Sequence, residues 1–142
     1  MIFDPDNPVI QICAQGMAKE GEGKPGEAKV LFLEAWGRAS NDFEKFIAAH
    51  YIARHQDSIT DKLEWDKMAL HFALTIKDES VQAQLPSLYL NIAKCYEDLN
   101  DRDMAKNHYQ LALSYTSYLP EDGYGKMIKA GIEKGLERIG SK

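Results

Sequence analysis

Apolar residues recur along this chain at spacings of three and four, which places them on one face of an α-helix. The first example is the series Val9, Ile12, Cys13, Gly16 and Met17. The same spacing returns in every segment between the predicted turns. No segment alternates apolar and polar residues convincingly enough to predict a β-strand. The pattern therefore predicts an all-α fold.

Prolines and capping residues divide this pattern into about seven helices. Asn7 and Pro8 form an N-cap followed by a proline at the first helical position, and Pro25 and Pro120 open helices in the same way. The other expected caps are Asn41 or Asp42, Ser58 or Thr60, and Asn100 or Asp101. The fifth helix has two possible starts: Ser80 caps a helix kinked at Pro86, or Pro86 is itself the first helical residue.

The seven helices pair into hairpins that share a repeat. The expected hairpins span about 8–40, 42–77 and 81–118, and a last helix spans about 120–139. In the first hairpin Gly16 precedes Ala28 by twelve residues, and in the third Ala93 precedes Ala105 by the same distance. A small residue in the first helix of each pair allows the second helix to approach closely.

The segment LYLNIAKCYEDLNDRDMAKNHYQLAL, from Leu88 to Leu113, resembles a tetratricopeptide repeat (TPR). The segments ICAQGM, IARHQ, PSLYLN and LPEDGYG are similar to those of small bacterial TPR-like proteins of undefined role. The resemblance implies one domain over residues 1–142, with three TPR-like hairpins in a right-handed α-solenoid and a C-terminal capping helix. Such an array is stable because neighbouring hairpins bury each other's apolar faces.

Composition and charge narrow the classes of function. The 142 residues are 44% hydrophobic and 27% charged, with a net charge of −5. This charge argues against generic binding to nucleic acids or anionic membranes, which requires a cationic surface. The uncharged stretches are much shorter than the ~20 apolar residues of a membrane span. The N-terminal sequence lacks the pattern of a signal peptide, so we expect a cytoplasmic protein.

The residues capable of chemistry do not form a catalytic or metal-binding pattern. His50 and His55 are five residues apart, which turns them away from one helical face, and Cys13 has no obvious base near it in sequence. The glycine-rich turn at 21–26 lacks the order of a phosphate-binding loop. We therefore expect a protein that is not an enzyme and that needs no cofactor or metal.

Binding has more support from the sequence. In TPR proteins the first helices of successive hairpins line a concave groove, and the resemblance implies groove positions for Met17, His50, Arg54, Ser87, Leu90, Asn91 and Lys94. His50 and Arg54 are four residues apart and project from one side of their helix. An asparagine offers a donor and an acceptor to an extended peptide, and an arginine offers a fork to a carboxylate. Met17 and Leu90 would supply apolar contact.

The resulting hypothesis is a protein-interaction module that binds a peptide or acidic segment in the groove. A structural role for the same residues stays open: Arg54 and His50 could pair with Asp57, Glu97 or Asp98, and Lys94 could be solvated.

Two other functions also stay open. One is a self-associating structural protein, such as a homodimer, which an apolar outer face on the final helix would favour. Gly131 and Gly135 in that helix indicate tight docking, internal or between copies. The other is an accessory or sensor subunit that binds a small anion.

Overall fold

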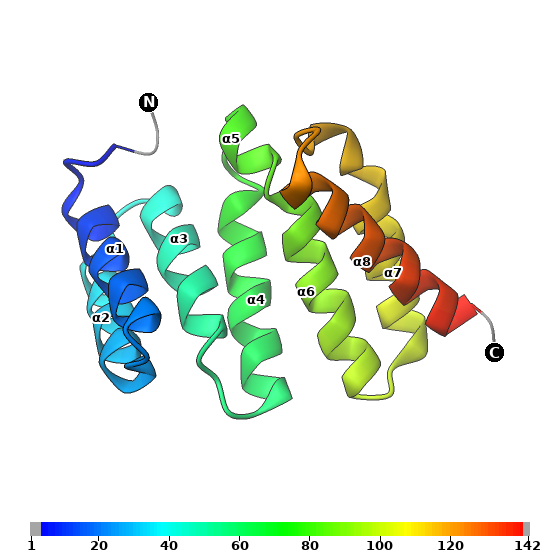
Figure 1. Ribbon diagram of the computed structural model, residues 1–142, viewed down its shortest axis with the longest axis horizontal. Coiled ribbons are helices and arrows are strands. Elements are labelled where there is room, and N and C mark those ends of the chain that lie inside the picture. The colour runs from blue at the N-terminus through cyan, green and yellow to red at the C-terminus, as the bar shows by residue number, and fades with distance from the viewer. Residues whose placement is uncertain (1–3, 141–142) are drawn as a thin grey trace. The chain divides into compact units, whose positions relative to one another are not determined.

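The computed structural model describes residues 4–140, and these residues form helices and the turns between them, without a β-strand (Figure 1). The elements are α1 (Pro8–Gly21), α2 (Pro25–Arg38), α3 (Asp42–Ala53), α4 (Ile59–Ala73), α5 (Glu79–Gln82), α6 (Leu85–Asp98), α7 (Arg102–Ser114), the 3₁₀ helix η1 (Thr116–Tyr118) and α8 (Gly123–Gly140). The predicted all-α fold of solenoid type is confirmed.

Side-chain caps determine where several helices begin. The side chain of Asn41 accepts a hydrogen bond from the Glu44 N–H, Ser58 accepts one from Asp61, and Asp101 accepts one from Met104. Each bond satisfies an N–H group that has no partner within the first turn of its helix. These bonds decide the alternatives that the sequence left open for α3, α4 and α7.

Two predicted helix starts need correction. Asp78, rather than Ser80, caps the short helix α5, and α6 begins at Leu85 with Pro86 in its first turn. The last helix begins at Gly123 and not at Pro120. Asp122 decides this second start, because its carboxylate accepts the N–H of Gly125 at 2.9 Å and its carbonyl accepts the N–H of Lys126.

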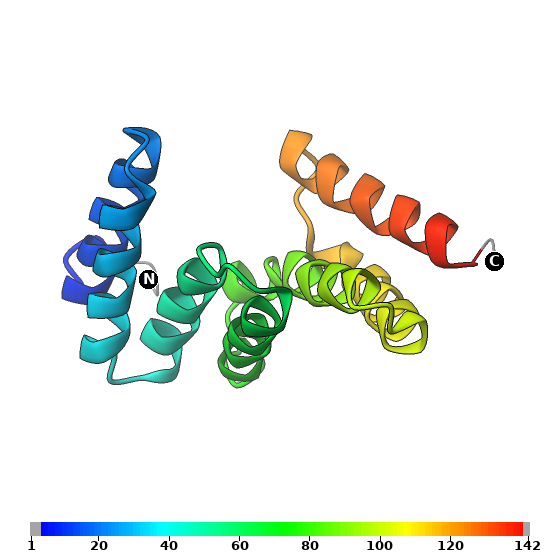
Figure 2. The same cartoon turned by 90° about the horizontal axis from the view of Figure 1, so that it is seen from below.

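The chain divides into two compact units, with the boundary between Ile76 and Lys77. In unit 1, α1 pairs with α2, α3 packs on α2 and along α1, and α4 pairs with α3 (Figures 1 and 2). In unit 2, α6 pairs with α7, and α8 packs on α7 and along α6. The single domain over residues 1–142 stays a prediction.

Glycine allows close approach at one position in each unit. A Cβ on Gly16 of α1 would lie 2.4 Å from the ring of Phe32, and a Cβ on Gly135 of α8 would lie 2.2 Å from the ring of Tyr109. Both rings are completely buried. Gly131 of α8 lies against Leu90 in the same way, though less tightly. The spacing of Gly131 and Gly135 thus reflects docking of α8 within unit 2.

Candidate functional site

Unit 1 has an apolar hollow where α1 and α3 lie side by side. Its volume is about 100 Å³. We call it the α1–α3 pocket, and its lining residues are Ile10, Cys13, Ala14, Met17, Ile47 and Tyr51. Met17 is 46% exposed, so its thioether lies at the mouth of the pocket and remains adaptable. Burial raises the pKa of the Cys13 thiol to about 12, so this residue lines the pocket as a neutral group.

Arg54 places a positive charge beside this pocket. It follows α3 directly, and its guanidinium lies over the Tyr51 ring, 5.0 Å from the centroid. One guanidinium N–H donates to the Oε1 atom of Glu20 at 3.1 Å. The Arg54 side chain is 46% exposed. The apolar lining of the pocket and an accessible cation therefore meet at Tyr51, which lines the pocket and carries the Arg54 guanidinium over its ring.

Glu20, at the end of α1, has a second partner in His55. The Nε2 atom of His55 lies 2.7 Å from Oε2 of Glu20, and the His55 ring stacks on Phe32 with centroids 5.6 Å apart. Arg54 and His55 also border a polar hollow of about 300 Å³, which Lys29 lines as well. Beside them Gln56 caps α3 by donating to the carbonyl of Ile52 at 3.1 Å.

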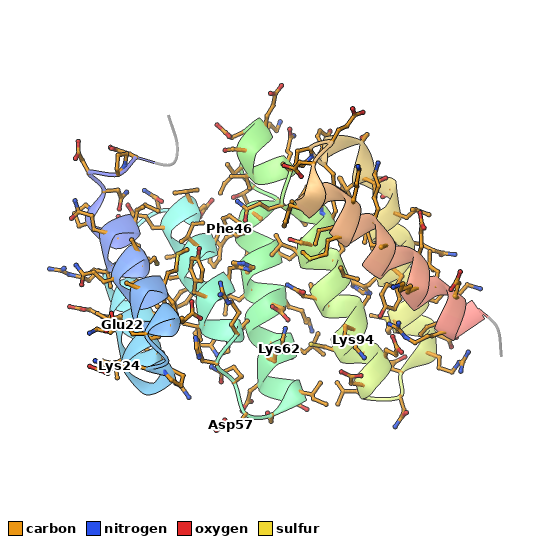
Figure 3. All side chains as sticks on the ribbon, viewed as in Figure 1. Glu22, Lys24, Phe46, Asp57, Lys62 and Lys94 are labelled. Carbon is orange, nitrogen blue, oxygen red and sulfur yellow. The ribbon has the colours of Figure 1, made fainter. Side chains whose placement is uncertain are left out.

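His50 is held as a neutral side chain between cationic neighbours. Its Nδ1 atom is buried and has no hydrogen-bond partner in the described part of the chain. Burial, together with the positive charges of Arg54 and Lys62, lowers the pKa of His50 to about 4. Lys62, on α4 (Figure 3), is bound through Nζ to the buried carboxylate of Asp66 at 2.7 Å.

The four predicted site residues of α6 lie in unit 2, and they differ in how many contacts they already make within that unit. The Ser87 hydroxyl donates to the carbonyl of Gln84 at 3.0 Å, and Leu90 packs under Gly131 of α8. Lys94 (Figure 3) is exposed and forms an ion pair with Asp98 at 2.9 Å. Asn91 is half-buried on the same helix. Asn91 and Lys94 thus have more capacity for a ligand than Ser87 and Leu90.

Unit 2 also contains a polar network that sequence reasoning missed. Both oxygens of Glu97 accept from Arg138, at 2.8 and 3.1 Å, and the Tyr109 hydroxyl donates to Glu97 at 2.6 Å. The hydrogen bonds from Arg138 are the largest cause that lowers the pKa of Glu97, to about 2, and the hydrogen bond from Tyr109 lowers it as well. This network ties α6, α7 and α8 together.

Sequence reasoning also missed Ile47, Tyr51 and Glu20 in unit 1. Ile47 and Tyr51 are four residues apart, a spacing that places both on one face of α3. Glu20 precedes Phe32 by the same twelve residues that separate Glu97 from Tyr109. Both spacings can be read from the sequence. They identify a site only once the face of α3 that packs against α1 is known.

One comparison with known proteins bears on this architecture. Residues 86–117 match the family model described as tetratricopeptide repeat. The hairpin of α6 and α7 in unit 2 is TPR-like. The matched segment contains nearly all of α6 and the whole of α7, the helices that sequence reasoning expected to resemble the repeat most closely. No curated protein and no solved structure matches the chain.

Within residues 4–140, no group of three or more His, Cys, Asp or Glu side chains could hold a metal ion. No helix in the same range has both the length and the apolar character needed to cross a bilayer.

Proposed function

We propose that this protein is a protein-interaction module whose first unit binds an extended peptide along α1 and α3. An aliphatic side chain of the peptide enters the α1–α3 pocket, and a neighbouring carboxylate binds Arg54. One observation carries this proposal: Tyr51 lines an apolar hollow of about 100 Å³, and over its ring lies the guanidinium of Arg54, whose side chain is 46% exposed. A TPR-like repeat in the same chain supports an interaction role of this kind.

The chemistry of the pocket favours this type of ligand. Burial of aliphatic groups contributes about 0.8 kcal/mol for each CH₂ removed from water. An arginine adds direction, because its planar fork offers two parallel donors to a carboxylate. Stacking on Tyr51 orients the guanidinium before a ligand arrives. His50, four residues before Arg54 in the sequence, is neutral at pH 7, so it would offer the peptide a hydrogen bond without a charge.

Asn91 and Lys94 on α6 form a second proposed contact surface, to be tested separately from unit 1. The ion pair between Lys94 and Asp98 is exposed, with side-chain exposures of 53% and 40%. Such a pair contributes about 0–1 kcal/mol, so a peptide carboxylate could replace Asp98 at little cost. The proposal leaves out Ser87 and Leu90 because contacts within unit 2 already engage them.

A second candidate is recognition of a small anion, which the polar hollow lined by Lys29, Arg54 and His55 favours. Self-association has less support. Most exposed side chains of α8 are charged: Lys126, Lys129, Glu133, Lys134, Glu137 and Arg138. Its exposed large hydrophobic residues are Tyr124 and Met127, in the first two turns.

The test uses two fluorescent hexapeptides, one of alternating leucine and glutamate and one of alternating leucine and glutamine. Fluorescence anisotropy would measure their affinity for the wild type and for Met17→Glu, Arg54→Ala and Lys67→Ala. Lys67 is the matched control, since it is a cation of unit 1 that is 48% exposed and pairs with Glu64 away from the pocket residues.

We expect the acidic peptide to bind the wild type, and Arg54→Ala to weaken binding about tenfold through loss of a charged hydrogen bond. Met17→Glu should weaken it by a similar factor, because it places a negative charge at the pocket mouth. Lys67→Ala should bind like the wild type. Absence of binding to the wild type would contradict the proposal. Competition by inorganic phosphate alone, without any effect of Met17→Glu, would favour the small-anion function instead.

A further inference from the structure

The same pair of side chains occurs once in each unit. Glu20 and Glu97 are each the penultimate residue of their helix, α1 or α6, and each lies twelve residues before a completely buried aromatic ring, Phe32 or Tyr109. Each glutamate accepts a hydrogen bond from an arginine of the third helix in its group. Arg54 directly follows α3, which packs on α2, and Arg138 lies near the end of α8, which packs on α7. The helices α1, α2 and α3 therefore correspond to α6, α7 and α8.

The pair in unit 2 is fully engaged. Glu97 receives two N–H groups from Arg138 and the hydroxyl of Tyr109, and Arg138 also donates to that hydroxyl at 3.2 Å. Gly135 brings the backbone of α8 directly against the Tyr109 ring. Opening this arrangement would leave several polar groups without partners, so it serves to hold α8 in place.

The pair in unit 1 is less engaged. Phe32 stands where unit 2 has Tyr109, so the aromatic ring offers no hydroxyl to Glu20. Tyr51 stacks on Phe32 with centroids 5.0 Å apart, at the place where Gly135 touches Tyr109. Tyr51 also lines the α1–α3 pocket. Unit 1 thus differs from unit 2 at Phe32 and Tyr51, and Tyr51 is one of the residues that line its apolar pocket.

We infer that Glu20 is an internal competitor for Arg54, and that a ligand binds unit 1 by replacing the Glu20 carboxylate on that guanidinium with its own. This inference rests on the proposed function and specifies the ligand further, as a segment with a carboxylate beside an aliphatic side chain. His55 makes the exchange inexpensive. It keeps its contact to the other oxygen of Glu20 at 2.7 Å, so Glu20 retains a partner when Arg54 turns to the ligand.

The experiment uses two substitutions in unit 1 and their counterparts in unit 2, with the leucine–glutamate hexapeptide as probe. Glu20→Gln removes the competing charge and should strengthen binding about fivefold. Phe32→Tyr adds a hydroxyl that could donate to Glu20 and accept from Arg54, as the Tyr109 hydroxyl does with Glu97 and Arg138; it would hold Arg54 on Glu20 and should weaken binding by a similar factor. Glu97→Gln and Tyr109→Phe are the matched controls. They should lower the melting temperature and leave the peptide affinity within about twofold of the wild type.

The outcomes separate the two proposals. If the wild type binds and Arg54→Ala weakens binding about tenfold, but Glu20→Gln is no tighter than the wild type, internal competition is overturned and the proposed function stands. If the wild type does not bind the peptide, both are overturned. Should Phe32→Tyr fail to fold, Glu20→Gln decides alone. Its gain should be absent with the leucine–glutamine peptide, since that peptide has no carboxylate to exchange.

Discussion

Buried polar side chains determine much of the chemistry of unit 1 at the scale of single residues. Glu44, 8% exposed, accepts hydrogen bonds from Asn7 and from both the N–H and hydroxyl of Ser40. Burial alone would raise the pKa of Glu44, but these bonds outweigh it and hold the pKa below its ordinary value. Because Asn7 caps α1, Glu44 joins the start of α1 to α3. His50 lacks such compensation.

His50 should make the protein less stable in mild acid. Its folded pKa of about 4 lies below the value of 6.5 in an unfolded chain, so between these values the unfolded state binds a proton that the folded state does not. Stability is therefore lost as the pH falls from about 6.5 towards 4. We expect His50 to account for a loss of about 1–2 kcal/mol between pH 7 and pH 5. Urea unfolding at both pH values would measure it.

His50→Gln is the matched variant for this prediction, because glutamine is polar and does not titrate. Its free energy of unfolding should change less between pH 7 and pH 5 than that of the wild type. An equal change in both proteins would show that other groups cause the acid sensitivity.

At the scale of elements, the docking of α8 depends on two glycines with different surroundings. A Cβ at Gly135 would meet the buried ring of Tyr109 at 2.2 Å, whereas a Cβ at Gly131 would meet a methyl group of the half-buried Leu90 at 3.2 Å. A leucine side chain at the edge of a core can move by a few tenths of an ångström. A ring fixed by two hydrogen-bond partners cannot.

Alanine substitutions should therefore have opposite effects at these two positions. Gly135→Ala should lower the free energy of unfolding by about 2 kcal/mol, because overpacking outweighs the higher helix propensity of alanine. Gly131→Ala should be neutral or stabilising by up to about 1 kcal/mol. Thermal and urea melts of both variants test this. Equal destabilisation would mean that Leu90 is held as rigidly as Tyr109.

At the scale of the whole molecule, each unit packs aromatic side chains among residues of its own. Phe32 and Tyr51 stack in unit 1, whereas Tyr109 packs with Ala93, Ala105 and Ile139 in unit 2. In repeat proteins each element depends mainly on its immediate neighbours, so damage is expected to stay local.

Gly135→Ala should thus speed amide hydrogen exchange in α6, α7 and α8 and leave the protection of α1 to α4 close to that of the wild type. Native-state exchange followed by mass spectrometry of peptic fragments would show the pattern. An equal rise in exchange across both units would indicate that the whole chain opens as one cooperative body.

Local sequence patterns predict the helices and most of their ends to within a few residues. Apolar spacing and capping depend on contacts within about one turn, so the linear pattern is sufficient to this precision, and the hydrogen bonds of Asn41, Ser58 and Asp101 decided between neighbouring candidates. The pattern also placed Met17 and His50 on their helices and Arg54 at the end of one. The start of α8 was predicted wrongly because Pro120 and Asp122 both carry start signals, and the hydrogen bond of Asp122 to Gly125 decided between them.

Tertiary structure decided which of those residues are available to a ligand. Leu90 and Arg54 both had suitable positions in sequence, but packing places Leu90 under Gly131 and leaves Arg54 half-exposed over Tyr51. The arginine partners of Glu20 and Glu97 lie 34 and 41 residues away, at or near the ends of helices whose facing sides no local pattern specifies. Local periodicity determines that a face is apolar, whereas the packing of one helix against another determines what covers it.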